Sequence, residues 1–203
     1  MKSLLGLVVV LIASACSKDT SVDQVRMEDE LAYYVDSEAL VTGAYLKKLK
    51  GKVYESGAFL EGKKDGVWQK FHNNGQVSEK YNFKNGIQDG VQEVFYNNGK
   101  IKDQVAYVNG QKEGAFLKFY TSGARKSEET YGNGKSNGTT KLYYKNGQLK
   151  EETTYKGGKV DGISNRYFGN GEWKSKQSYS NGKKHGPWED YHSNGQLESK
   201  GQY

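Results

Sequence analysis

The sequence predicts an all-β protein, an elongated antiparallel meander of repeated β-hairpins in an open, twisted, solenoid-like sheet. Glycines recur every 24 residues from about residue 51 onward, and two aromatic series recur in phase with them. Asn-Gly pairs fall at the turn positions. A fixed period of this length is typical of an array in which each unit buries its apolar face against its neighbours. The glycine series begin at Gly62, Gly66 and Gly75, and the aromatic series begin at Phe59 and Phe71.

One unit, residues 67–90, has the pattern of a hairpin. Two β-prone runs, residues 67–72 and 76–83, are separated by Asn73-Asn74-Gly75. Asn-Gly is a strong hairpin signal because both residues tolerate positive φ. An acidic residue such as Asp65 or Asp89 precedes the glycine before each first strand in most units, which is also turn chemistry. Successive hairpins therefore give an antiparallel meander.

The register depends on the loop at Gly75. A three-residue loop with Gly75 in the left-handed region places Phe71 opposite Val77 and Val67 opposite Tyr81. Phe71, Val77 and Phe83 then share one face. A two-residue loop exchanges the partners, since a slip of one residue flips a strand. We favour the three-residue loop.

The N-terminus resembles an export signal. Residues 1–15 combine Lys2, a short apolar run and small residues before Cys16, and the run is too short to span a bilayer. Ala13-Ser14-Ala15-Cys16 resembles the lipobox of bacterial lipoproteins, which implies a lipid on Cys16, followed by a polar tether over residues 16–30. The alternative is an ordinary cleaved signal that leaves a free thiol. The lipobox implies a location outside the inner membrane, at the outer membrane or the cell surface.

The repeat domain is expected over residues 31–203, as about six full repeats after a degenerate first one at residues 43–53. Fourteen strands follow from this count. Residues 31–35 fit either a capping strand or a short helix that starts near Val22.

Composition favours a thin sheet over a thick aliphatic core. Hydrophobic residues are 34% of the chain and aromatic residues 13%, so rows of rings supply most of the apolar area. The formal net charge of +6 is spread along the chain. Lys and Glu alternate on the second strands, which indicates a solvated face. A nucleic-acid site would need clustered basic residues, so no nucleic-acid partner is expected.

One row of rings is the candidate binding surface. Exposed apolar patches mark binding sites, and rings beside polar groups suit glycans and peptides. Simple packing between strands is the alternative. The row comprises Trp68, Tyr96, Phe116, Tyr120, Tyr144, Phe168 and Trp188.

No catalytic, metal or cofactor site is expected. His72 and His192 occupy one repeat position five units apart, where other units have Tyr or Phe, so both read as packing residues. Gly134-Lys135-Ser136 resembles the end of a phosphate-binding loop, but Glu129 occupies the place of its first glycine. One acid per turn, as at Asp89, is too few oxygens for tight calcium binding.

The units resemble the MORN repeat variant family of bacteria. The resemblance rests on W-x-x-[FY]-[HY]-x-N-G-Q-[VL], best matched at residues 68–77 and 188–197, followed by [FY]-x-N-G-K-x-[DH]-G at residues 179–186. It implies a repeat sheet without catalytic residues. Members are often labelled antitoxin components, and related repeats are regarded as protein- or lipid-binding scaffolds.

The sequence therefore predicts a monomeric, non-enzymatic, lipid-anchored scaffold that binds a protein or another ligand at the cell envelope. Two alternatives remain open: an antitoxin or immunity component that neutralises a toxin, and a cell-wall or glycan-binding module.

Overall fold

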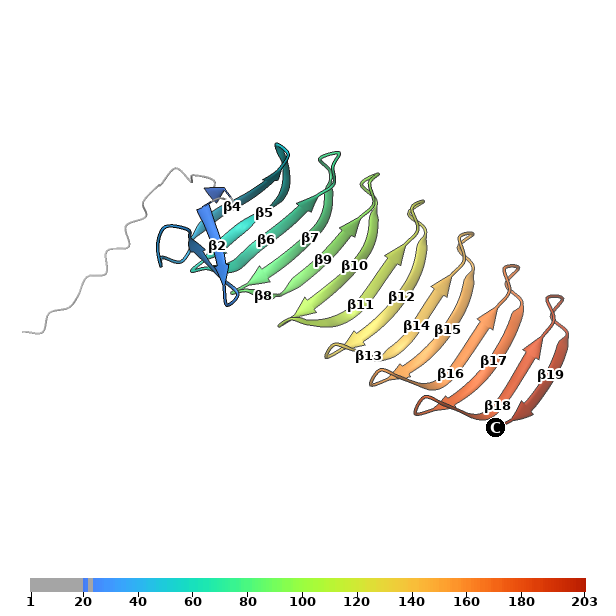
Figure 1. The fold of residues 1–203 in the computed structure, drawn as a ribbon. Coiled ribbons are helices and arrows are strands. Elements are labelled where there is room, and N and C mark those ends of the chain that lie inside the picture. The colour runs from blue at the N-terminus through green and yellow to red at the C-terminus, as the bar shows by residue number, and fades with distance from the viewer. Residues whose placement is uncertain (1–19, 22–23) are drawn as a thin grey trace, which may run out of the picture.

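The computed structural model describes residues 20–21 and 24–203, and these form a long single-layer sheet (Figure 1). From β4 to β19, the register shows that the strands pair with their neighbours in chain order. The sheet contains β1 (Thr20–Ser21), β4 (Gly43–Leu49), β5 (Lys52–Leu60), β6 (Lys63–Phe71), β7 (Val77–Lys84), β8 (Ile87–Gln88), β9 (Gly90–Phe95), β10 (Ile101–Val108), β11 (Gln111–Phe119), β12 (Arg125–Gly132), β13 (Lys135–Ser136), β14 (Gly138–Tyr143), β15 (Leu149–Lys156), β16 (Lys159–Tyr167), β17 (Trp173–Ser180), β18 (Lys183–Tyr191) and β19 (Leu197–Gln202).

The predicted meander is confirmed. The sheet has seventeen strands. Strand β1 pairs in parallel with β4 at one edge, and β8/β9 and β13/β14 are each two pieces of one strand. Without β1, and with each of these two pairs counted as one strand, the sheet has the fourteen antiparallel strands that the repeat count predicts.

Both turn types follow the sequence. Gly75 has φ 85° and its N–H donates to the carbonyl of His72 at 2.9 Å, which gives the three-residue loop we favoured. At the other end of the hairpins, Asn85 and Gly86 both have positive φ, 51° and 82°. Positive φ at both central residues is the signature of a type I′ turn.

Part of the predicted register is wrong. Phe71 does pair with Val77, but Trp68 rather than Val67 lies opposite Tyr81. A β-bulge leaves Ser78 of β7 unpaired between the Lys70–Glu79 and Phe71–Val77 pairs, and one extra residue is enough to change faces. Phe83 therefore shares a face with Trp68, not with Phe71. The two aromatic series lie on opposite faces of the sheet.

The N-terminal segment folds over the first edge of the sheet. Strands β2 (Val25–Glu28) and β3 (Leu31–Tyr34) form a separate hairpin, so residues 31–34 are a strand rather than a helix, and the range expected as tether ends in β2. The N–H of Ala32 donates to the carbonyl of Gly62 at 2.8 Å, and the N–H of Val41 donates to the carbonyl of Ala32 at 2.9 Å.

One face of the sheet holds its buried side chains, and we call it the inner face. Cross-strand partners share a face, and this places every buried side chain of β4–β19 on the same side. The strands are arched (Figure 1), and side chains converge on the hollow side of an arch, so the inner face is the concave one. These residues are Tyr45, Phe59, Trp68, Val105, Ser127, Thr153, Ser164 and Ser175. In the described part of the chain, no helix has the length and apolar character to cross a membrane.

Candidate binding face

The inner face is filled with rings at its N-terminal end. Trp68 is only 2% exposed. Its ring centroid lies 5.4 Å from that of Tyr45 and 5.0 Å from that of Phe59. Gly57 makes room for it, because a Cβ there would lie 2.3 Å from the Trp68 ring. The indole N–H donates to the carbonyl of Ala58 at 3.0 Å. Trp68, a residue of the predicted row, is thus packed within the sheet.

Phe116 and Trp188 lie on the same face but are only half-buried. The Phe116 ring lies 6.2 Å from that of Tyr131, and the Lys112 ammonium sits 4.5 Å from its centroid. Trp188 lies 6.1 Å from Tyr203. Ring–ammonium contacts of this kind cover part of the ring surface.

Most of the remaining predicted rings form hydrogen bonds between neighbouring repeats. The hydroxyl groups of Tyr96, Tyr120 and Tyr144 each donate to a main-chain carbonyl 23 residues later, at 2.7 Å. A ring nitrogen of His72 lies 3.1 Å from the carbonyl oxygen of Phe95, in the equivalent place. Phe168 has no hydroxyl for this bond. The hydroxyl edges of the tyrosine rings therefore serve to join neighbouring repeats. The ring faces are half-buried and lie at the border of the inner face.

The floor of the inner face changes between Phe116 and Trp188. The central position of each first strand carries Trp68, Gln92, Phe116, Thr140, Ser164 and Trp188 in turn. Thr140 pairs with Thr153, which pairs with Ser164, so three hydroxyl side chains lie on adjacent strands. The Thr153 and Ser164 oxygens are 2.9 Å apart. These small residues leave a cavity of about 260 Å³.

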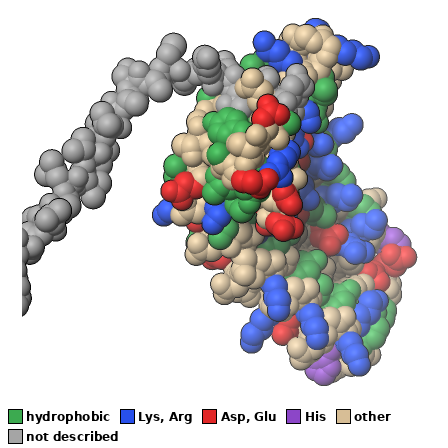
Figure 2. All heavy atoms as spheres, turned by 60° about the vertical axis from the view of Figure 1, so that its left-hand side comes forward, with side chains coloured by type: hydrophobic (Ala, Val, Ile, Leu, Met, Phe, Trp, Pro, Cys, Tyr) green, Lys and Arg blue, Asp and Glu red, His purple; other side chains and the backbone are tan. Residues whose placement is uncertain are grey.

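Acidic and basic groups surround this floor as pairs. Lys118 lies 3.3 Å from Glu129, and Arg166 lies 3.2 Å from Glu151. Figure 2 shows Lys and Arg interspersed with Asp and Glu over the face in view, with hydrophobic side chains between them. A face with paired charges has no strong field of one sign.

A charged group nearer the N-terminus shows how this packing perturbs titration. Burial and the hydrogen bond to Glu79 raise the pKa of Tyr81 to about 12. Burial acts to raise the pKa of Glu79, but hydrogen bonds from Tyr81 and Lys70 outweigh it and hold that pKa below its ordinary value. Lys70 donates to Glu79 at 2.9 Å. The three side chains act as one network.

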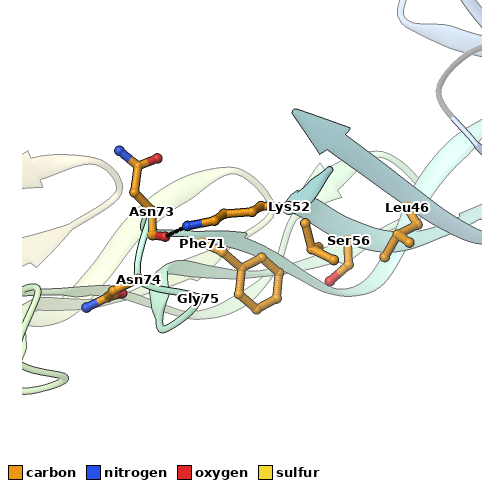
Figure 3. Close-up of a pocket in the computed structure, with 8 residues that line it drawn as sticks. Leu46, Lys52, Ser56, Phe71, Asn73, Asn74 and Gly75 are labelled. Atoms are coloured by element: carbon orange, nitrogen blue, oxygen red, sulfur yellow. Dashed lines mark hydrogen bonds between the residues drawn. The ribbon is translucent and has the colours of Figure 1, made fainter. Parts of the chain in front are cut away.

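The outer face has a separate cavity at the first full hairpin (Figure 3). It measures about 540 Å³ and is lined by Leu46, Ser56 and Phe71 among others. The Lys52 ammonium donates to the carbonyl of Asn73 at 2.9 Å and closes one side. Phe71, the first member of its series, therefore lines a cavity on the face opposite the predicted row.

The turn carboxylates have structural partners. Asp65, Asp89 and Glu113 accept hydrogen bonds from the main-chain N–H groups of Asn85, Asn109 and Asn133 at 2.9–3.2 Å, each 20 residues later. This agrees with the turn role predicted for them. Among residues 20–21 and 24–203, no group of three His, Cys, Asp or Glu side chains is arranged to hold a metal ion. Cys16 lies outside the described residues.

Sequence reasoning missed the polar floor at Thr140, Thr153 and Ser164. The signal was present as a break in the aromatic pattern, where Thr140 and Ser164 replace a large residue at the central position. Only the strand register showed that Glu129 and Glu151 lie beside these residues.

The fold and this face define a single-layer array of β-hairpin repeats with an open, ring-lined concave surface. Four segments of the chain, residues 64–85, 88–109, 136–156 and 184–203, match the model of the MORN repeat variant. Their first residues are one or two 24-residue periods apart, so all four segments are in phase. These four segments are therefore similar to MORN repeats, which are generally protein- or membrane-binding modules and typically non-catalytic. No curated protein matches the chain in sequence.

Proposed function

We propose that this protein is a non-catalytic binding scaffold, held at the bacterial cell envelope by a lipid on Cys16, with the inner face as its binding surface. The observation that carries the proposal is the continuous concave face. At its N-terminal end this face is buried in one cluster with Ala32 and Val41 of the N-terminal segment. Beyond that cluster it presents half-buried rings and hydrogen-bonding groups, to which Phe116, Tyr144 and Trp188 contribute.

Cys16 and the preceding Ala13-Ser14-Ala15 support the anchor. A tether from Cys16 to β1 would deliver the chain at the capped edge of the sheet, because β1 pairs with β4. The opposite end of the array would then extend away from the membrane surface. The part of the inner face beyond the buried cluster of Tyr45, Phe59 and Trp68 would remain accessible.

The test compares the wild-type chain with Cys16→Ala and, as a matched control, Ser17→Ala. Wild type and Ser17→Ala should incorporate a fatty-acid probe and sediment with membranes, whereas Cys16→Ala should do neither. A Cys16→Ala variant that still labels and sediments would contradict the anchor.

A pull-down of the anchored wild-type protein from its own cells tests the scaffold role. Recovery of a toxin as the main partner would favour the antitoxin or immunity function instead. Loss of the partner from an inner-face variant, with retention by an outer-face variant, would support the inner face as the binding surface.

A further inference from the structure

The C-terminal half of the inner face is hollow where the N-terminal half is filled. At the N-terminal end, Tyr45, Phe59 and Trp68 occupy the centre of the face. Three and four repeats after Trp68, the same central position carries Thr140 and then Ser164. Other repeats of the same array carry a large residue, such as Trp68 or Phe116, at this position. Small residues there make fewer packing contacts. The hollow is therefore a specific feature of these repeats.

Hydrogen-bonding groups converge on the hollow. Its walls include Glu129, Thr140, Glu151 and Thr153. Each carboxylate has one basic partner, Lys118 or Arg166, and each accepts one hydroxyl hydrogen bond, Glu129 from Tyr131 and Glu151 from Thr153. A carboxylate has about four acceptor positions. Lone pairs therefore remain for a ligand that donates hydrogen bonds.

A buried hydroxyl beside the hollow lacks a partner. Ser127 is 3% exposed, and its Oγ accepts or donates no hydrogen bond within the described protein. It pairs across the sheet with Leu142, which lines the hollow. Buried polar groups are nearly always hydrogen-bonded to protein, water or ligand. The Ser127 hydroxyl is therefore a further polar group beside the hollow, covered by its neighbours.

Ring surfaces flank the polar floor. Tyr155 lines the hollow itself. Phe168 lines a second hollow of about 320 Å³ on the same face, together with Arg166 and Gln177. Two strands per repeat place equivalent groups ~10 Å apart along the sheet, which is about the length of a disaccharide. A ligand that lies across the strands would meet the same type of wall once in each repeat.

We propose that the inner face between Phe116 and Trp188 binds a neutral glycan chain laid across strands β12 to β18. Its hydroxyl groups would donate to Glu129 and Glu151 and exchange hydrogen bonds with the Ser and Thr floor. Its apolar ring faces would pack on Tyr155 and Phe168. Neutrality follows from the charges, because the acidic and basic groups along the hollow already pair with one another.

This inference rests on the proposed scaffold function and names the ligand class of the same face. Its failure is distinguishable, because the anchor is tested by lipid labelling and sedimentation, which involve no ligand. A chain that sediments through Cys16 yet binds no glycan would overturn the glycan proposal alone.

The experiment uses the full chain in detergent and a panel of neutral oligosaccharides built from glucose, galactose or N-acetylglucosamine, in lengths of two to eight sugars. Calorimetry should show binding to at least one series, with affinity that increases with length beyond one disaccharide. Dextran sulfate serves as the polyanion control. Absence of binding across the neutral panel, or binding of dextran sulfate alone, would overturn the proposal.

Two adjacent threonines provide the matched variants. Thr140→Trp restores a large residue to the floor and should weaken oligosaccharide binding at least tenfold. Thr139→Trp places the same ring on the outer face, because Thr139 pairs with Thr154 there, and should bind as wild type does. Glu129→Gln adds a variant that keeps the side-chain volume and should weaken binding several-fold. Equal affinities for Thr140→Trp, Glu129→Gln and wild type would refute the site.

Discussion

The hydroxyl of Tyr120 donates a 2.7 Å hydrogen bond to the main-chain carbonyl of Tyr143, across the boundary between two repeats. The same bond recurs from Tyr96 to Phe119 and from Tyr144 to Tyr167. A second ladder follows the loops, where Asn74 donates to the carbonyl of Asn97 and Asn146 to that of Gly169. The array is thus joined by side chains as well as by strand pairing.

Phe168 interrupts the tyrosine ladder, and Phe168→Tyr should repair it. The new hydroxyl would reach the carbonyl of Tyr191, 23 residues later, as in the other repeats. A net gain of about 1 kcal/mol in unfolding free energy is expected for one hydrogen bond, measured by urea denaturation. Tyr144→Phe should lose about the same amount. Tyr54→Phe, on a ring 39% exposed, is the control and should change little. Equal stability of all three variants would show that the ladder contributes nothing.

Gly57 and Trp68 should be coupled. Gly57→Ala places a methyl group 2.3 Å from the Trp68 ring, so the ring must leave its site, with a cost on the order of 1–3 kcal/mol. Trp68→Ala should cost about 3–5 kcal/mol by truncation of a buried ring.

The double variant tests whether these two costs share one cause. Once Trp68 is truncated, the added methyl group at Gly57 has no ring to displace. Thermal melts should therefore show the double variant no less stable than Trp68→Ala alone. Full additivity of the two losses would mean that the residues do not interact.

Deletion of residues 91–114 should leave a folded, shorter array. The cut removes one whole unit and joins Gly90 to Ala115, and Gly90 and Gly114 occupy equivalent positions with φ 113° and 74°. Deletion of residues 91–102 joins unlike strands and should disrupt the sheet. Circular dichroism and limited proteolysis of both variants provide the measurement. Similar damage from the two deletions would mean that the units are not modular.

The Lys70–Glu79–Tyr81 network should make stability depend on pH at both ends. The folded pKa of Glu79 is lowered, so its contribution is present above the unfolded pKa of about 4.3 and is lost as the pH falls through the folded value. The folded pKa of Tyr81 is raised to about 12, so its contribution is present below the unfolded pKa of about 10 and is lost as the pH rises through about 12.

Urea midpoints measured from pH 3 to pH 12 test this network. Glu79→Gln should flatten the acid decline relative to wild type, and Tyr81→Phe should make the alkaline decline shallower. Glu198→Gln, at an exposed position on the last strand, is the control. An acid decline in Glu79→Gln as steep as in wild type would contradict the role of this carboxylate.

The structure separates the members of the predicted ring row by burial and by hydrogen bonding. Alternation within a strand correctly placed Trp68, Phe116 and Trp188 on one face. The sequence could not show that Gly57 makes room for Trp68, or that Ala32 and Val41 join it in one buried cluster at 2% exposure. It also could not show that the hydroxyls of Tyr96 and Tyr120 form hydrogen bonds between repeats. Both depend on residues brought together by strand pairing.

The sequence by itself determined the repeat, the strand count and the turns, because glycine and Asn-Gly at a fixed period satisfy local φ requirements that few other residues meet. The tertiary structure alone decided which faces the rings occupy. The reason is the bulge at Ser78, opposite Lys70 and Phe71, because this single extra residue leaves no clear trace in an alternating pattern but reverses every side chain beyond it. The same pairing placed Thr140, Thr153 and Ser164 on one floor and made the inner face concave.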